Sequence, residues 1–396
     1  MRVLLADKLA SACIEALEEM GHEVLTQPDL TADQIPDALD GVEVLVVRST
    51  RVSAQALERG RDLSLVIRAG AGVNTIDLPT ASKRGIYVAN CPGKNTAAVA
   101  ELAIGLIVAA DRQIVDATTA LRNGSWEKKR FGAARGLCGR TLGVLGFGSI
   151  GRAVAERARG LGMRVIAWSR NLTAENAPAG IEIVDSPIAL AKASDAVTLH
   201  LAFAEGTKHI VNREFLAAMR PGTILVNTAR GELVDPGALC DAIEEKKLRV
   251  GLDVFEDEPA GGKAEFPATD LAAVTTATPH IGASTNEASE AIAAEVVRII
   301  SVFQQTGRPP IAVNLCERGE AKCNLVVRHL NRVGVLAGLL DGLRREDINV
   351  EEMDNVIFAG GEAACCTLLL SQSPSPQFVA SLEQDACILY SAIREL

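Results

Sequence analysis

The stretch Thr141-Leu142-Gly143-Val144-Leu145-Gly146-Phe147-Gly148-Ser149-Ile150-Gly151 decides the fold, because an apolar run leads directly into a glycine-rich turn. The run predicts a buried strand and the residues after the turn predict a helix. Gly146 permits a tight turn, Gly148 lets a pyrophosphate approach the backbone, and Gly151 lets helix and strand pack closely. We therefore predict a dinucleotide-binding unit, with a ligand-free glycine turn as the alternative. The residues expected to bind the dinucleotide here are Gly146, Gly148, Ser149, Ile150 and Gly151.

Strands and helices are predicted to alternate on both sides of this stretch. Downstream strands are expected at Arg164 to Trp168, Ala196 to His200, Thr223 to Asn227, Val250 to Val254 and Ala273 to Thr276. Upstream, apolar runs at Val3 to Ala6, Val44 to Val47 and Leu65 to Ile67 alternate with amphipathic stretches such as Leu9 to Met20. A helix from Asn95 to about Leu121, capped by Asn95 and Thr96, is expected to connect the two groups. This order predicts an α/β protein with two doubly wound parallel sheets of the Rossmann type.

The chain after residue 284 adds a return to the first sheet and a small terminal module. Residues 286–306 are strongly helical and residues 307–310 break the helix. Beyond residue 322 the expected order is βαββαβ, a ferredoxin-like arrangement that favours regulation or oligomerisation over catalysis. The predicted domains are residues 1–92 with 285–315 for substrate, residues 93–284 for the dinucleotide, and residues 322–396 as a regulatory module.

Composition excludes several classes of function. The 396 residues carry a formal net charge of -10, which gives no overall positive field for nucleic acid or an acidic membrane surface. The apolar run Ala97 to Ala110 contains Glu101 and is too short to span a bilayer. The nine cysteines form no C-x-x-C pair, which favours reduced thiols in the cytoplasm and no metal site. The N-terminus has no signal-peptide pattern.

The residues after the second strand of the dinucleotide unit decide between NAD and NADP. An acidic residue there binds the ribose hydroxyls of NAD, but this chain has Ser169 and Arg170. Arg170 is able to pair with the 2′-phosphate of NADP. The alternative is that Arg170 stacks on adenine or points to solvent, so both cofactors remain open.

Three further segments each follow a predicted strand of the second sheet. They are Asn227-Thr228-Ala229-Arg230-Gly231, residues 251–259 and Thr278-Pro279-His280-Ile281-Gly282. Because ligands bind at the carboxyl edge of such sheets, Arg230, Glu258 and His280 are expected to meet there. With the glycine motif, these segments resemble the D-isomer-specific 2-hydroxyacid dehydrogenases over residues 1 to 315. The resemblance implies an NAD(P)-dependent oxidoreductase and places Asp253 near the nicotinamide.

The chemistry of such a reaction requires these residue types. Reduction of a 2-keto acid puts negative charge on the carbonyl oxygen, and His280 is the expected proton donor. Glu258 is expected to orient the imidazole and favour its protonated form. Arg230 is expected to hold the carboxylate and polarise the carbonyl. The alternative for His280 is a core histidine that bonds to the backbone, and the alternative for Arg230 is a surface salt bridge. His200 also ends a strand, but its surroundings favour a structural or cofactor-lining role.

The first domain is expected to hold the rest of the substrate. Arg48 and Ser49 follow one strand and Arg68 ends the next, so all three meet at one sheet edge and suit a phosphate. Both segments are similar to the phosphoglycerate dehydrogenases within this family, which implies a phosphorylated hydroxy acid. The alternative is exposed arginines that hold loops. The backbone of Ala71, Gly72 and Val73 suits a carboxylate, and the predicted substrate residues are Arg48, Ser49, Arg68, Ala71, Gly72, Val73 and Asn95.

The C-terminal module resembles the ACT regulatory domain, which binds serine in many phosphoglycerate dehydrogenases. The resemblance is carried by residues 329–336, from His329 to Leu336, and by Asn349, although Val333 replaces the usual proline. It implies serine contacts from His329, Asn331 and Asn349. A module that only dimerises is the alternative.

These observations together predict oxidation of 3-phosphoglycerate to 3-phosphohydroxypyruvate with NAD(P), in serine biosynthesis. A homodimer or homotetramer is expected. The alternatives are a glyoxylate or hydroxypyruvate reductase, which Arg170 favours if NADPH is the donor, and a nucleotide-sensing protein like the corepressors that share this fold.

Overall fold

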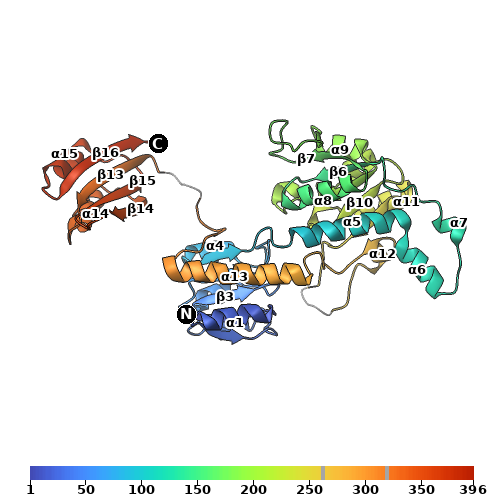
Figure 1. Cartoon of the computed structure of the whole chain (residues 1–396), viewed down its shortest axis with the longest axis horizontal. Coiled ribbons are helices and arrows are strands. Elements are labelled where there is room, and N and C mark those ends of the chain that lie inside the picture. Colours follow the sequence, from blue (N-terminus) through green and yellow to red (C-terminus); the bar gives the residue numbers. More distant parts are fainter. Residues whose placement is uncertain (260–263, 317–320) are drawn as a thin grey trace. The chain divides into compact units, whose positions relative to one another are not determined.

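The chain separates into two compact units in the computed structural model, which describes residues 1–259, 264–316 and 321–396. The first unit is Met1–Asn314 and the second is Leu315–Leu396. Figure 1 shows the elements of each unit, which form two parallel sheets in the first and one antiparallel sheet in the second.

The first sheet has five parallel strands in the order β2-β1-β3-β4-β5. They are β1 (Arg2–Leu5), β2 (Glu23–Thr26), β3 (Val44–Val47), β4 (Leu65–Arg68) and β5 (Tyr87–Asn90). All four residues of β3 are buried, because helices cover both faces of the sheet. The helices on one face are α1 (Ser11–Glu19) and α13 (Asn286–Thr306), which lie side by side in Figure 1. Those on the other are α2 (Ile35–Ala38), α3 (Ala54–Arg59) and α4 (Leu78–Lys83).

The second sheet has seven parallel strands in the order β12-β11-β10-β9-β6-β7-β8. They are β6 (Thr141–Leu145), β7 (Arg164–Trp168), β8 (Glu182–Ile183), β9 (Ala196–Leu199), β10 (Ile224–Asn227), β11 (Arg249–Leu252) and β12 (Thr276–Ala277). The helices around it are α8 (Ser149–Gly160), α9 (Pro187–Ala193), α10 (Arg213–Ala218), α11 (Pro236–Lys246), α12 (Thr269–Ala273) and the short α7 (Lys128–Phe131). Helix α8 starts directly after the glycine turn, as the sequence predicts. The expected strand from Ala273 was wrong, because Ala273 ends α12 and pairing begins only at Thr276.

The long connecting helix is broken where one continuous helix was expected. It consists of α5 (Thr96–Arg112) and α6 (Ile114–Arg122), separated by Gln113 in the left-handed conformation with φ 51°. That conformation ends α5, because a residue other than glycine with positive φ cannot continue a right-handed helix. The helix opens where it was predicted, with Asn95 at the N-cap position, but the Asn95 side chain makes no capping hydrogen bond.

The second unit has the predicted order βαββαβ. Its elements are β13 (Cys323–Leu330), α14 (Val335–Arg345), β14 (Val350–Ile357), β15 (Ala363–Leu370), α15 (Pro376–Gln384) and β16 (Ile388–Glu395). The sheet order β14-β15-β13-β16, with every neighbour antiparallel, is that of a ferredoxin-like module. Residues on alternate positions of β13 and β15 are buried together with Leu339 and Phe378 of the two helices.

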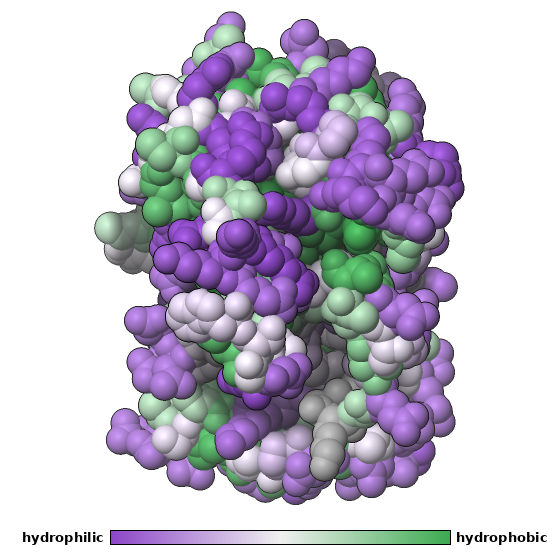
Figure 2. Space-filling view, turned by 90° about the vertical axis from the view of Figure 1, so that its right-hand side faces the viewer, coloured by the Kyte–Doolittle hydropathy of each residue, from purple (hydrophilic) through white to green (hydrophobic). Residues whose placement is uncertain are grey.

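The surface carries apolar residues on α6 and on the loop after it. Ile114, Val115, Leu121 and Trp126 are exposed, and Trp126 retains 79% of its accessible surface. Figure 2 shows the face that carries α6 and α7, where hydrophilic residues predominate and hydrophobic ones gather in smaller patches. Within the described ranges, no helix combines the length and apolar character needed to cross a membrane.

Candidate active site

A cleft of about 770 Å³ in the first unit brings together the loops that follow strands of both parallel sheets. Its lining includes Ala71 to Asn74 after β4, His200 after β9, Arg230 after β10, Asp253 after β11 and His280 after β12. Every one of these positions is at the carboxyl end of a strand, where parallel sheets bind ligands.

The glycine turn has the geometry that a dinucleotide requires. Gly146 has φ +99° and lies so close to the backbone of His200 that a Cβ atom would overlap it. A Cβ atom on Gly151 would overlap the carbonyl oxygen of Gly146, so helix α8 packs tightly on the turn. A Cβ atom on Gly148 would meet nothing within 4 Å, so the open space at that position is available to a ligand. The buried hydroxyl of Thr228, which lines the cleft, has no hydrogen-bond partner among the described residues. These features fit a bound dinucleotide.

Asp253 fixes the loop that carries His280. Its carboxylate accepts hydrogen bonds from the hydroxyl of Thr278 at 2.6 Å and from the backbone N–H groups of Ile281 and Gly282 at 2.8 and 2.9 Å. Burial raises the pKa of Asp253, although these hydrogen bonds oppose the shift. The carboxylate therefore organises the loop from inside.

His280 and Glu258 form a direct pair. The imidazole Nδ1 lies 2.6 Å from Oε2 of Glu258, and Oε1 of the same carboxylate accepts the N–H of Phe255 at 2.8 Å. His280 has φ 51°, and its own N–H donates to the carbonyl oxygen of Asp253 at 2.8 Å. The side chain is 49% exposed at the cleft, so Nε2 is the nitrogen left for a substrate.

Arg230 reaches across the cleft toward the first sheet. Its guanidinium lies so close to Gly72 that a side chain there would overlap it, and it donates to the carbonyl oxygen of Ala229 at 2.6 Å. The buried Asn227 shapes the loop, because its amide donates to the carbonyl oxygen of Arg230 at 2.7 Å. The structure therefore brings Arg230 and His280 to one cleft.

Further cations gather on the wall that the first sheet provides. Burial, with the neighbouring charges of Arg230 and Arg48, lowers the pKa of the Arg68 guanidinium to about 10. Arg51, which was not selected from the sequence, lines the cleft, whereas Arg48 and Ser49 are not among its lining residues. In the described part of the chain no ion pair joins these arginines to a carboxylate.

Asp7 is a structural residue that the sequence analysis missed. Its Oδ2 accepts the backbone N–H groups of Arg48, Ser49 and Thr50 at 2.7, 3.1 and 3.0 Å. These three donors are therefore committed to Asp7, and only the side chains of this loop are available to a substrate. Asp7 lies 41 residues before Arg48, so only the folded chain reveals the contact.

The loop of Ala71, Gly72 and Val73 presents backbone donors to the cleft. Their N–H groups have no intramolecular acceptor among the described residues, while the carbonyl oxygen of Ala71 accepts the amide of Asn90 at 2.6 Å. Asn95, whose side chain does not cap α5, also lines the cleft. This arrangement suits a carboxylate, as the sequence predicts.

His200 is excluded from acid–base work near neutral pH. Its Nε2 lies 2.9 Å from the hydroxyl of Thr198, and its Nδ1 is buried without a partner among the described residues. Burial lowers the pKa of the His200 imidazole to about 3. The ring therefore stays neutral over the range in which His280 is expected to act.

Ser169 and Arg170 directly follow β7, next to the glycine turn. The N–H of Gly146 donates to the carbonyl oxygen of Trp168 at 2.9 Å, so the end of β7 lies against the turn. Arg170 is exposed. No hydrogen bond or ion pair of its side chain occurs within the described residues, which leaves the guanidinium available to a cofactor.

The three residues expected to contact serine have partners inside the second unit. His329 is buried, with Nε2 3.1 Å from Oδ1 of Asn355 and Nδ1 2.8 Å from the carbonyl oxygen of Leu330. The amide of Asn331 donates to the carbonyl oxygen of Gly361 at 2.9 Å. The amide of Asn349 donates to Glu351 at 2.8 Å. His329 therefore belongs to the interior of the module.

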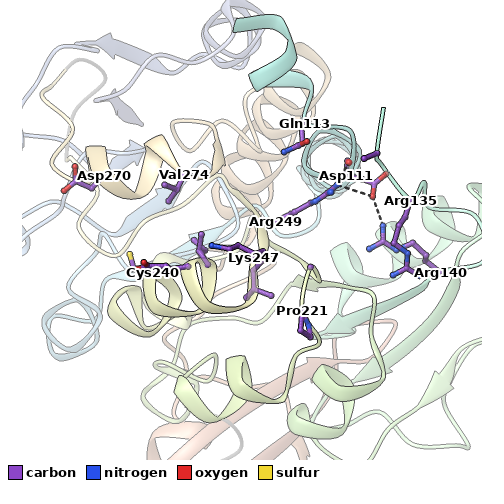
Figure 3. Close-up of a pocket in the computed structure, with 15 residues that line it drawn as sticks. Asp111, Gln113, Arg135, Arg140, Pro221, Cys240, Lys247, Arg249, Asp270 and Val274 are labelled. Atoms are coloured by element: carbon purple, nitrogen blue, oxygen red, sulfur yellow. Dashed lines mark hydrogen bonds and ion pairs between the residues drawn. The ribbon is translucent and has the colours of Figure 1, made fainter. Parts of the chain in front are cut away.

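A larger cavity, of about 960 Å³, lies at the opposite edge of the second sheet (Figure 3). Its buried Arg140 donates to Asp111 at 2.7 Å and to the carbonyl oxygen of Asp195 at 2.9 Å. Arg249 donates to the carbonyl oxygen of Asp111 at 2.5 Å. Both arginines donate to groups of the chain itself, although the buried Nε of Arg140 has no partner among the described residues, and the cavity therefore contains an ion-pair network that joins α5 to the starts of the strands. Its size does not mark the chemical site.

Comparisons with known proteins agree with the site. The family model for the NAD-binding domain of D-isomer specific 2-hydroxyacid dehydrogenases matches residues 104–282. A hydroxypyruvate reductase of Thermotoga maritima is 41% identical over 308 residues, which are 77% of this chain and 98% of that protein. A D-3-phosphoglycerate dehydrogenase of Methanocaldococcus jannaschii is 42% identical over 294 residues, 74% of this chain and 55% of that protein. The aligned part thus covers about half the length of that relative.

The solved structures agree at the level of the fold. The TT0316 protein from Thermus thermophilus superposes with a TM-score of 0.72 at 34% identity, covering 79% of this chain and 100% of that one. Fold and cleft define an NAD(P)-dependent oxidoreductase. The chain belongs to the D-isomer specific 2-hydroxyacid dehydrogenase family.

Proposed function

We propose that this chain is a D-3-phosphoglycerate dehydrogenase, which interconverts 3-phosphoglycerate and 3-phosphohydroxypyruvate with NAD(P) and feeds serine biosynthesis. The observation that carries the proposal is a cluster of cations at the cleft: Arg51, Arg68 and Arg230 line it, and the charge of the nearby Arg48 acts on Arg68. The positive charges of these arginines repel one another, and a bound anion offsets this repulsion. A substrate with both a carboxylate and a phosphate supplies enough negative charge to pair with all of these arginines, whereas a simple keto acid supplies a single negative charge.

The residues of the cleft divide the chemical work. Bound NAD(P) supplies the hydride acceptor for oxidation at C2. While C2 is oxidised, Nε2 of His280 takes the hydroxyl proton, and the C2–O bond becomes a carbonyl. Glu258 holds Nδ1 and stabilises the imidazolium that forms. Arg230 binds the carboxylate and the oxygen on C2, with the N–H groups of Ala71 to Val73 as further carboxylate donors.

For the cofactor, we propose that the glycine turn binds the pyrophosphate and that Asp253 orders the wall beside the nicotinamide. The exposed Arg170 is free to meet a 2′-phosphate, with Ser169 beside it. NADP is therefore a second substrate of this site beside NAD.

A hydroxypyruvate reductase is the second candidate. The relative from Thermotoga maritima with that name aligns over 98% of its length. Hydroxypyruvate carries no phosphate, so it leaves part of the cation cluster without a partner. The two functions are distinguished by the effect that replacing the loop arginines has on kcat/KM for phosphorylated and for unphosphorylated acids.

Arg48→Ala is expected to lower kcat/KM for 3-phosphoglycerate about 10 to 100-fold more than for D-glycerate, because a desolvated charge-assisted contact is worth about 1.5 to 3 kcal/mol. Steady-state rates with both acids measure the ratio. Arg51→Ala tests the lining arginine in the same way, and Arg84→Ala, an exposed position of the same sheet domain, is the control. An equal loss with both acids would refute the phosphate assignment.

For the second unit, we propose an ACT-like role with serine as an inhibitor. Gly334, with φ 92°, lies at the start of α14 and leaves helix N–H groups for an amino-acid carboxylate. Asn331 and Asn349 remain exposed and are the side chains proposed to contact serine, while His329 supports them from the interior. Adding L-serine to the rate assay tests this role.

We further propose that residues 1–92 with 285–315 hold the substrate, that residues 93–284 hold the cofactor, and that copies of the chain associate. The exposed apolar residues of α6 and the loop after it support association, because large apolar groups on a surface favour contact with another protein. Sedimentation of the full chain measures the oligomeric state.

A further inference from the structure

The loop that carries Glu258 holds a second carboxylate that is paired with a histidine. Both oxygens of Glu256 lie near Nε2 of His209, at 3.1 and 3.2 Å. The two side chains are partly buried, at 33% and 25% exposure, and they are separated by 47 residues in the chain. This pair therefore joins the loop after β11 to a different loop, which follows the short 3-10 helix Glu205–Thr207.

His209 is itself tied to the segment that follows Arg230. Its N–H donates to the carbonyl oxygen of Glu232 at 2.9 Å, and two residues later the N–H of Val211 donates to that of Leu233 at 3.0 Å. His209 has φ 48°, a left-handed conformation that few residues other than glycine adopt. Surrounding contacts must hold such a residue in place, and such residues gather where a position is specified.

A third contact joins the segment of Arg230 to the loop that carries Glu258. Gly231, next to Arg230, lies so close to the carbonyl group of Phe255 that a Cβ atom would overlap it. The N–H of Phe255 in turn donates to Oε1 of Glu258 at 2.8 Å. The segments of Arg230, His209 and Glu258 are thus in direct contact.

We propose that His209 is a positioning residue, whose hydrogen bond with Glu256 holds the loop of Glu258 in register with the segment of Arg230. The pair fixes the point from which Glu258 reaches His280, and so sets the geometry of the proton transfer. Neither His209 nor Glu256 is among the residues that line the cleft, so both act through Glu258. The inference rests on the proposed roles of His280 and Glu258.

Charged groups of the described residues lie near both pairs. Lys208 lies 3.9 Å from Glu256, and the carboxylates of Asp253 and Glu258 interact with His280. Loss of the His209–Glu256 pair is therefore expected to act on His280 through the position of Glu258. A displaced carboxylate stabilises the protonated imidazole less, which lowers the pH at which reduction is half-maximal.

The test uses the full chain with two disrupting variants, His209→Asn and Glu256→Ala. Asparagine tolerates the left-handed backbone but is too short to reach Glu256. Each variant is expected to lower kcat about tenfold, because small displacements in an active site are costly. The KM for the cofactor stays unchanged, and the midpoint of the pH profile of keto-acid reduction moves to lower pH. Combining the two changes adds no further loss, because they remove the same link.

Two matched variants and a stability measurement serve as controls. Glu256→Gln keeps a hydrogen-bond acceptor and is expected to retain most of kcat, while Lys208→Ala, an exposed neighbour, behaves like the unmodified chain. A lowered Tm with an unchanged pH midpoint indicates a structural role and overturns the inference. An unchanged kcat and an unchanged pH profile in His209→Asn and Glu256→Ala also overturn the inference, provided that His280→Ala is inactive. Full activity of His280→Ala overturns the proposed function itself, which keeps the two failures distinguishable.

Discussion

Replacing His280 by alanine is expected to lower kcat by about a thousandfold or more, since a positioned general acid–base group contributes about 10² to 10⁴ in rate. His280 is the histidine of the cleft with a carboxylate partner, at 2.6 Å from Glu258, and Nε2 remains for the substrate. His200 cannot substitute, because burial lowers the pKa of its imidazole to about 3. Pre-steady-state oxidation of NADH by the keto acid measures the loss.

Cofactor binding is the internal control for this variant. The glycine turn from Gly146 to Gly151 is built from β6 and α8 and does not involve His280. The Kd for NADH, measured by fluorescence, should therefore stay within about twofold, since surface changes away from a contact have small effects. A His280→Ala chain that transfers hydride at the original rate would contradict the acid–base assignment.

Replacing Arg230 by glutamine is expected to lower kcat/KM for the keto acid about 10³-fold. Arg230 faces the first sheet across the cleft, where its guanidinium lies beside Gly72. In the proposed mechanism it holds both the carboxylate and the oxygen on C2, so its loss is expected to raise KM and to remove charge stabilisation in the transition state. Steady-state kinetics with varied keto acid separates the two contributions.

Two further variants make this second test specific. Arg230→Lys keeps the charge but lacks the planar pair of donors. Its kcat/KM is expected to be about tenfold higher than that of Arg230→Gln but well below that of the unmodified chain, because the donor geometry contributes more than the charge alone. Arg213→Gln removes an exposed arginine that pairs with Asp241 in the same unit, and it should leave both parameters unchanged. Equal kinetics for Arg230→Gln and Arg213→Gln would contradict the role of Arg230.

Buried parallel strands were predictable because they are continuous apolar runs. β3, β6 and β7 were expected at the bounds at which they occur. β2 begins with Glu23 and ends with Thr26 at a sheet edge, and β8 has only two residues, so neither produces such a run. Their pairing depends on neighbours that the local sequence does not specify.

The break at Gln113 shows a second limit. The residues on both sides of it favour a helix, and no glycine or proline stands at the break, since Gly105 lies within the continuous helix α5. The left-handed conformation arises from the tertiary structure, which overrides local propensity. Strand β12 was misplaced for a related reason, since Ala273 ends α12 and Val274 is the C-cap of that helix.

Those residues of the candidate site that directly follow a strand could be predicted from the sequence. Because Arg230, Asp253 and His280 follow parallel strands, the rule for the carboxyl edge predicts that they lie together, and all three line the cleft. Asp7 and His209 lie far along the chain from the loops they hold, and neither belongs to a motif. Their roles depend on contacts of folded loops, which a pattern of residues does not reveal.

The most direct test of the central claim is the initial rate of the unmodified chain with 3-phosphohydroxypyruvate and with hydroxypyruvate, each with NADH and with NADPH. The cation cluster predicts a kcat/KM for the phosphorylated acid at least about 10²-fold higher with the better cofactor, which is the value of one or two charge-assisted contacts. Equal rates, or faster reduction of hydroxypyruvate, would contradict the account.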